Sequence, residues 1–212
     1  MKKGEKRKSE LLQIAYRLFV SKGYENTSVD EIIEEAKIAK GTYYYYFESK
    51  EQMLEEVIGM MIDKEAGAAS DIASSDMPVP QKIIGIIAAF RPAPDEHSIE
   101  GALMQPENAI MHRKIKLHLV DKCVPMLSEV VNEGIGQGIF DCDHVPERVR
   151  MLLNLSNDTF DEGQFSENDV AVFIDMAEKL FGAAPGTMDF ISGLITKQYD
   201  NNLPEGHSGG EK

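Results

Sequence analysis

Apolar residues recur at intervals of three and four along almost the whole chain, and no stretch alternates strictly between apolar and polar positions. This spacing puts apolar side chains on one face of an α-helix, whereas strict alternation is typical of a half-buried strand. The first such stripe is formed by Leu11, Ala15, Leu18 and Phe19, and Gly23 ends it. The pattern therefore predicts an all-α fold built from successive amphipathic helices.

Two helix starts carry a clear capping signal. Both have the capping-box spacing, in which a serine hydroxyl accepts from the amide three residues later and the side chain of that later residue accepts from the serine amide. The two pairs are Ser28 with Glu31 and Ser49 with Gln52. Beyond the first helix, the predicted helices span about 29–36, 40–47, 50–69, 81–90, 97–104, 106–137, 146–160, 167–182 and 187–199. Two short helices joined by the four residues "AKIA", with a third helix packed across them, form a helix-turn-helix pattern.

The second helix of this pattern contains four consecutive tyrosines, residues 43–46. A helix turns about 100° per residue, so four consecutive rings do not share one face. If Tyr43 points inward beside Phe47, its i+4 neighbour, then Tyr44 and Tyr45 point outward and Tyr46 lies near the boundary. Outward tyrosines on a short helix favour a binding surface; the alternative is that all four rings are structural and cover the small core of the head.

Charge is distributed unevenly along a chain whose net charge is −14. Residues 1–50 hold 10 Lys and Arg against 8 Asp and Glu, and the remainder holds 12 against 28. A near-neutral head with a basic N-terminal arm can approach phosphate, while an acidic body is repelled by it. The alternative, that acidity only keeps the body soluble, stays open.

Other functional classes lack their signals. No apolar run approaches the roughly 18 residues of a membrane span, and the basic N-terminus lacks the apolar stretch of a signal peptide. Cys123 and Cys142 are too few for a disulfide framework, so we expect a reduced, cytoplasmic protein without membrane contact. We find no Gly-rich phosphate loop, nucleophile elbow or paired metal motif, so we expect no enzyme, cofactor or metal. The stretch "DCDH", 141–144, is interpreted as a solvated turn.

Residues 9–54 resemble the DNA-binding head of the TetR family of bacterial transcription regulators. The resemblance rests on Gly-Tyr-x-x-Thr-Ser-Val at 23–29, Lys-Gly-Thr-x-Tyr-x-x-Phe at 40–47 and Ser-Lys-Glu-x-x-Leu at 49–54. It implies a helix-turn-helix domain at 1–48, basic arm included, and a helical ligand-binding and dimerisation domain at 49–203. The polar, Gly-rich tail 204–212 is expected to be disordered.

The resemblance also assigns roles within the head. A recognition helix places its N-terminal residues at base edges, so Lys40, Gly41 and Thr42 are expected nearest to the bases. Tyr44 and Tyr46 match positions that touch phosphate, and Tyr45 matches an outward position against a base or sugar. Tyr43 takes a core position. Further phosphate anchors are expected at Lys50 and at the helix start formed by Ser28 and Val29.

Two residues of the turn depart from the family pattern. Lys37 stands where the family often has glycine, which predicts a left-handed backbone at a residue that has a side chain. Ala39 replaces the usual hydroxyl cap, which predicts an uncapped start for the recognition helix.

For the body, the resemblance implies a dimer built from the last two main helices and a ligand pocket. A dimer is also expected because one two-turn helix reads few bases and a two-fold axis doubles the readout. The predicted dimer surface is Val149, Leu152, Leu153, Val170, Phe173, Ile174, Ala177, Leu180 and Phe181; the alternative is that this stripe is monomer core. The candidate ligand residues are Met61, Met104, Met111, His118, Met126, Met151, Asn154 and Asp158. Methionine suits a permissive apolar site, and equally it fills core gaps.

Together these features predict a dimeric, sequence-specific DNA-binding regulator. We expect its partners to be a palindromic operator in double-stranded DNA, a second copy of itself and a small-molecule effector that releases it from DNA. Two alternatives remain: a body that responds to a protein partner, and a small-molecule-binding protein or enzyme without a DNA role.

Overall fold

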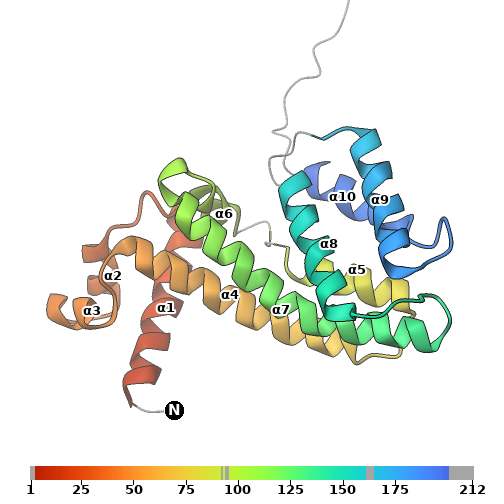
Figure 1. Ribbon diagram of the computed structural model, residues 1–212. Coiled ribbons are helices and arrows are strands. Elements are labelled where there is room, and N and C mark those ends of the chain that lie inside the picture. The colour runs from red at the N-terminus through yellow and green to blue at the C-terminus, as the bar shows by residue number, and fades with distance from the viewer. Residues whose placement is uncertain (1–2, 92, 94–95, 161–164, 201–212) are drawn as a thin grey trace, which may run out of the picture. The chain divides into compact units, whose positions relative to one another are not determined.

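The computed structural model describes residues 3–91, 93, 96–160 and 165–200 (Figure 1). Every regular element in these residues is helical, which confirms the predicted all-α class. The elements are α1 (Lys3–Lys22), α2 (Val29–Glu35), α3 (Lys40–Tyr46), α4 (Lys50–Ala73), α5 (Val79–Ala89), α6 (His97–Leu103), the 3-10 turn η2 (Pro106–Asn108), α7 (Ala109–Gly136), α8 (Val145–Phe160), α9 (Glu167–Phe181) and α10 (Phe190–Asp200). None of these helices combines the length and apolar content that crossing a bilayer requires.

The predicted bounds hold best where a local signal marks them. Gly23, with φ of +87°, follows α1, and Ser166 starts α9 through a reciprocal capping box with Asp169. Helix α4 runs four residues past its predicted end, because nothing that breaks a helix follows until Pro78. Helix α10 begins three residues late, since residues 186–189 form a turn. The predicted tail, 204–212, lies outside the described residues.

The chain divides into two compact units. The first unit comprises the described residues of 1–70 and 89–123, and the second those of 71–88 and 124–212. This division is one of compactness, so the predicted functional boundary at residue 48 stays a prediction.

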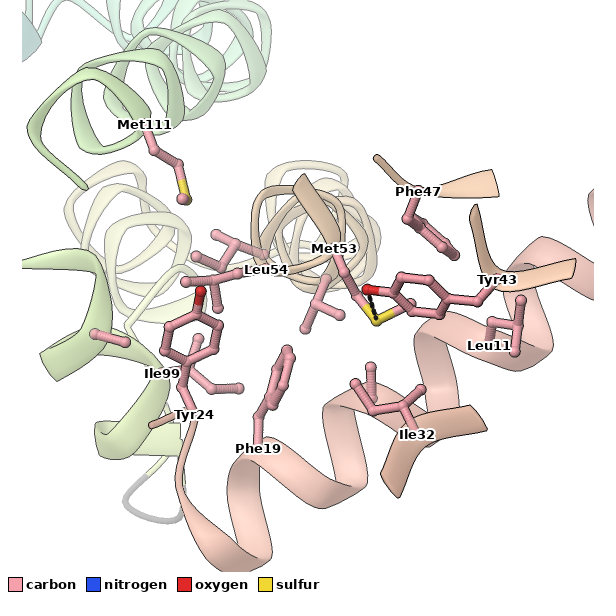
Figure 2. Close-up of a cluster of buried hydrophobic side chains, with 14 of the residues drawn as sticks. Leu11, Phe19, Tyr24, Ile32, Tyr43, Phe47, Met53, Leu54, Ile99 and Met111 are labelled. Carbon is pink, nitrogen blue, oxygen red and sulfur yellow. Dashed lines mark hydrogen bonds between the residues drawn. The ribbon is translucent and has the colours of Figure 1, made fainter. Parts of the chain in front are cut away.

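The core of the first unit joins the head to the helices that follow it. Figure 2 shows side chains from several elements directed into one apolar cluster. Its members include Leu11 and Phe19 of α1, Ile32 of α2, Tyr43 of α3, Met53 and Leu54 of α4, Ile99 of α6 and Met111 of α7. Because α3 is only seven residues long, its position depends on this packing and not on its own stability.

Hydrogen bonds also hold α6 and the segment before it against α1. The Tyr16 hydroxyl donates to Glu96 Oε1 over 2.7 Å, and the Ser98 hydroxyl donates to the Phe19 carbonyl over 2.8 Å. Glu96 is buried, and its second carboxylate oxygen accepts from the Ala93 amide. Burial, with a smaller contribution from the Glu96 charge, raises the pKa of Glu65 on α4 to about 7.

In the second unit, aromatic side chains pack α8 against α9. The Phe160 and Phe173 rings meet edge to face at 5.1 Å between centroids. Between α5 and α7, the buried ammonium of Lys82 pairs with Glu133 at 2.6 Å. Such a pair stabilises the fold only while both partners are present, because an unpaired buried charge is costly.

Candidate nucleic-acid interface

Helix α3 is braced from the inside by one of its four tyrosines. Tyr43 is fully buried, its ring lies 5.7 Å from that of Phe47, and its hydroxyl donates to the Ser49 carbonyl over 3.3 Å. Figure 2 also shows this hydroxyl directed at the Met53 sulfur. Burial raises the pKa of Tyr43 to about 12. The predicted inward orientation is confirmed, and it fixes the direction of the three tyrosines that follow.

The next two tyrosines face outward. The side chain of Tyr44 is 48% exposed and that of Tyr45 is 79% exposed, unusually high fractions for such large rings. Tyr46 is half-buried, as predicted for a boundary position. Its ring stacks edge to face on Tyr45, with centroids 4.9 Å apart, and its hydroxyl lies close to Gly4 of α1. The outer surface of α3 is therefore an aromatic ridge held from behind by Tyr43 and from one side by Tyr46.

The start of α3 presents a cation and an open backbone. Lys40 is exposed, and its ammonium contacts Asp30 Oδ1 of α2 at 3.1 Å. Asp30 is also the main reason why the pKa of Lys40 is raised. A Cβ added to Gly41 would meet nothing within 4 Å, so a partner can approach the backbone there. Thr42 is half-buried, one turn before Tyr46.

The turn between α2 and α3 has the backbone that the sequence predicts. Lys37 has φ of +50°, in the left-handed region. Its amide donates to the Glu34 carbonyl, and the next amide, of Ile38, donates to the Ile33 carbonyl. These two bonds form a Schellman motif, whose left-handed position is usually glycine. Ala39 gives α3 no side-chain cap, also as predicted.

Only one of the two hydrogen bonds of the capping box predicted at the start of α2 is present. Ser28 Oγ accepts from the Glu31 amide over 3.1 Å, so the cap is present. The Glu31 carboxylate does not complete the box, because it pairs with the Lys22 ammonium, which also lowers the pKa of Glu31. Val29 is half-buried and packs against the core cluster. The exposed residues at this helix start are therefore Ser28 and Asp30, and the Val29 side chain is turned toward the core.

Lys50 has a partner within the chain. Its ammonium donates to the Tyr24 carbonyl over 2.7 Å and lies 4.0 Å from the centroid of the Tyr24 ring. The sequence predicts Lys50 as a phosphate anchor, and that role stays a prediction. The contacts with Tyr24 tie Lys50 to the loop between α1 and α2 and leave part of its donor capacity for a phosphate.

The basic N-terminal arm is helical where it is described, as the first turns of α1. Arg7 pairs with Glu10 at 2.9 Å, and Lys8 pairs with Glu56 of α4. Lys6 is exposed. Part of the arm's positive charge is therefore neutralised within the chain.

The candidate ligand residues are dispersed. In the first unit, Met111 is buried in the core cluster and Met61 packs against it, whereas Met104 is exposed. His118 lies beside Asp63 on the surface. In the second unit Met126 is buried, and Met151, Asn154 and Asp158 are exposed. Asn154 and Asp158 thus share a face, as their spacing requires, but that face is not turned into the unit as the ligand hypothesis needed.

The predicted dimer stripe is largely internal. Val149, Val170, Phe173, Ala177 and Phe181 are buried within the second unit, and Leu152, Leu153, Ile174 and Leu180 are half-buried. The five buried side chains have no free apolar surface left for a partner, so we correct their assignment to monomer core. The large exposed apolar residues of the same two helices are Met151 on α8 and Val172 and Met176 on α9. Sequence reasoning missed the last two, although their i,i+4 spacing beside the stripe was a usable signal.

Two family models match separate stretches of the chain. Residues 11–57 match the family described as "Bacterial regulatory proteins, tetR family". Residues 95–180 match "Tetracyclin repressor-like, C-terminal domain". The HTH-type transcriptional repressor KstR2 of Mycolicibacterium smegmatis is 28% identical over 141 residues, 65% of this chain and 69% of that protein. The HTH-type regulator YuxN of Bacillus subtilis is 46% identical over 54 residues, 26% of this chain and 19% of that protein.

Solved structures agree on the fold. RolR in complex with the ligand resorcinol has a TM-score of 0.58 at 17% identity, covering 96% of this chain and 97% of that one. A transcriptional regulator from Cytophaga hutchinsonii has a TM-score of 0.54 at 18% identity, covering 82% and 94%. With both family matches and a head of the geometry described above, the chain belongs to the TetR family of bacterial transcription regulators.

Proposed function

We propose that this regulator binds a palindromic operator as a homodimer through the outer surface of α3. The observation that carries the proposal is the pair of outward tyrosines, Tyr44 and Tyr45, on a short helix braced by the buried Tyr43. Each ring meets a neighbouring tyrosine edge to face, Tyr44 on Tyr43 and Tyr45 on Tyr46, but most of the Tyr45 ring and about half of Tyr44 remain exposed, which is typical of a binding surface. Phenol hydroxyls suit phosphate oxygens, which position a protein on DNA.

Within this surface, the roles follow the position along the helix. Lys40, Gly41 and Thr42 form the first turn, the part that meets base edges in a major groove. Tyr44 and Tyr46 then contact phosphates, Tyr45 lies against a base or sugar, and Lys50 and the backbone at Ser28 and Val29 add anchors. The acidic body contributes no attraction to DNA, so binding depends on this small surface.

A second copy completes the readout. We place the dimer contact on the exposed apolar residues of α8 and α9, namely Met151, Val172 and Met176. A patch of exposed apolar side chains is typical of an interface that is covered in the assembled protein, and these three are the large exposed apolar residues of α8 and α9. A two-fold axis then presents two copies of α3 to two half-sites.

Release by a small molecule completes the proposal. It is supported by the KstR2 relative, named as a repressor, and by the fold shared with RolR, solved with a ligand. The effector must favour a conformation in which the two heads no longer fit adjacent major grooves, so effector and operator weaken each other reciprocally. We place this action in the cytoplasm, and we propose no catalytic activity.

The test is selection of bound duplexes from a random DNA pool at fixed moderate salt. It compares the wild type with Thr42→Ala and Tyr44→Phe. We expect the wild type to enrich a palindrome. Thr42→Ala should lose base preference at one position of each half-site, because a base contact is lost. Tyr44→Phe should bind all sequences more weakly, because a phosphate contact is lost. An enriched sequence without two-fold symmetry would contradict the dimer, and no enrichment would contradict DNA binding by this head.

A further inference from the structure

The ion pair between Asp30 and Lys40 lies at the edge of the proposed DNA-binding surface. It connects the first turn of α2 to the first residue of α3 across the turn that joins them, with 3.1 Å between Oδ1 and Nζ. Both side chains are exposed, Lys40 to 64% and Asp30 to 77%. The pair is therefore accessible to DNA, and neither partner is needed to fill the core.

A carboxylate at this position is unexpected for a surface that meets phosphates. Asp30 is two residues beyond the Ser28 cap, at the helix start proposed as a phosphate anchor, and its charge opposes phosphate binding. The neighbouring Glu31 has a partner in Lys22, whereas Asp30 faces the lysine at the base-reading end of α3. An acid in the first turn also complements the dipole of α2, so the feature that points to a further role is its contact with Lys40.

The chemistry of lysine suggests that role. A lysine ammonium is a point charge on a flexible four-carbon stem, and an unrestrained one next to DNA finds the nearest phosphate oxygen. It has three donors, and Asp30 uses one of them. The remaining two match the adjacent O6 and N7 acceptors of a guanine in the major groove. Lys40 and Tyr44 are also four residues apart on α3, so this ammonium and the Tyr44 phenol share one helix face.

We propose that Asp30 is a specificity-determining residue that holds the Lys40 ammonium toward the base edges and away from phosphate, so that Lys40 reads guanine. This inference rests on the proposed function of α3 as the reading helix. It adds a residue that makes operator binding weaker in general and more selective at one position. The repulsive part of this role disfavours non-cognate DNA, which is how specificity often arises.

The test measures base preference for the wild type, Asp30→Asn and the matched control Glu34→Gln by selection of duplexes from a random pool. Glu34 is an exposed acid on the same helix, so its variant removes one negative charge without touching Lys40. We expect Asp30→Asn to reduce the guanine preference at one position of each half-site by about twofold to fivefold, the range that an exposed ion pair can supply. It should also bind random-sequence DNA more tightly, with a salt dependence steeper by about one counterion. Glu34→Gln should keep the guanine preference.

Lys40→Met supplies the decisive background. If Asp30 acts through Lys40, adding Asp30→Asn to the Lys40→Met variant leaves its base preference unchanged. Asp30→Glu, which keeps the carboxylate, should retain most of the guanine preference of the wild type. An unaltered guanine preference in Asp30→Asn, or an equal loss in the Lys40→Met background, would overturn the inference while leaving the regulator intact. A wild type that enriches no sequence would overturn the proposed function and this inference together.

Discussion

The turn of the helix-turn-helix contains a backbone strain that one substitution should relieve. Lys37 occupies the left-handed position of a Schellman motif with φ of +50°. A residue with a Cβ in this conformation costs about 1–2 kcal/mol relative to glycine. Glycine in turn makes the unfolded chain more flexible, which removes about 0.4–1 kcal/mol of that gain. The Lys37 side chain is exposed, so little else changes.

The expected net effect of Lys37→Gly is a gain of about 0.5–1 kcal/mol in the free energy of unfolding. For a chain of this size, 1 kcal/mol corresponds to about 2–4 °C in Tm, so we expect a rise of about 1–4 °C. The assay is thermal unfolding of the full chain followed by circular dichroism. Lys37→Ala is the matched control, since it removes the same ammonium but keeps the Cβ, and it should not raise Tm. A fall in Tm for Lys37→Gly, or an equal rise for both variants, would refute the strain argument.

Three further experiments test the packing within the units and the proposed dimer contact. Glu65→Gln should raise Tm at pH 8 and not at pH 5. The pKa of Glu65 is about 7 in the fold and 4.5 in the unfolded chain, so between these pH values the folded carboxyl keeps its proton while the unfolded one loses it. The stability of the wild type therefore falls as pH rises from about 4.5 to 7, and glutamine, which does not ionise, avoids this loss. Glu133→Ala should destabilise by about 2–4 kcal/mol in urea unfolding, because it leaves a buried ammonium unpaired, while Glu129→Ala, exposed on the same helix, should change stability by less than about 0.5 kcal/mol. Val172→Lys combined with Met176→Lys should give a folded monomer by light scattering, and a persistent dimer would show that α9 presents another face.

The fold was predictable from the sequence to the extent that its signals are local. A capping serine such as Ser28 or Ser166 is recognised by residues within one turn, so these helix starts are visible in the sequence alone. The directions of the four tyrosines follow from helix geometry once Tyr43 is set inward beside Phe47. The left-handed turn at Lys37 followed from the family pattern.

The partners of charged and apolar side chains were less predictable, because they depend on residues far away in the sequence. Nothing in the spacing around Lys50 indicates that Tyr24 would bind it. The stripe that includes Val170 and Phe173 correctly marks a buried face of α9, but periodicity does not say whether the burying surface belongs to the same chain or to a partner. Asp30 was missed for the same reason, since its contact with Lys40 exists only once the turn is folded.

The most direct test of the central claim is the operator affinity of the Tyr44→Ala, Tyr45→Ala double variant, measured by fluorescence anisotropy on the selected duplex. Both side chains are outward, so the variant should stay folded, with Tm lowered by only about 2–6 °C through the lost edge-to-face contacts with Tyr43 and Tyr46. If α3 contacts DNA through these rings, each lost contact costs about 1 kcal/mol and the Kd should rise by roughly 10-fold to 50-fold. An unchanged Kd in a folded variant would contradict the proposal that this surface binds the operator.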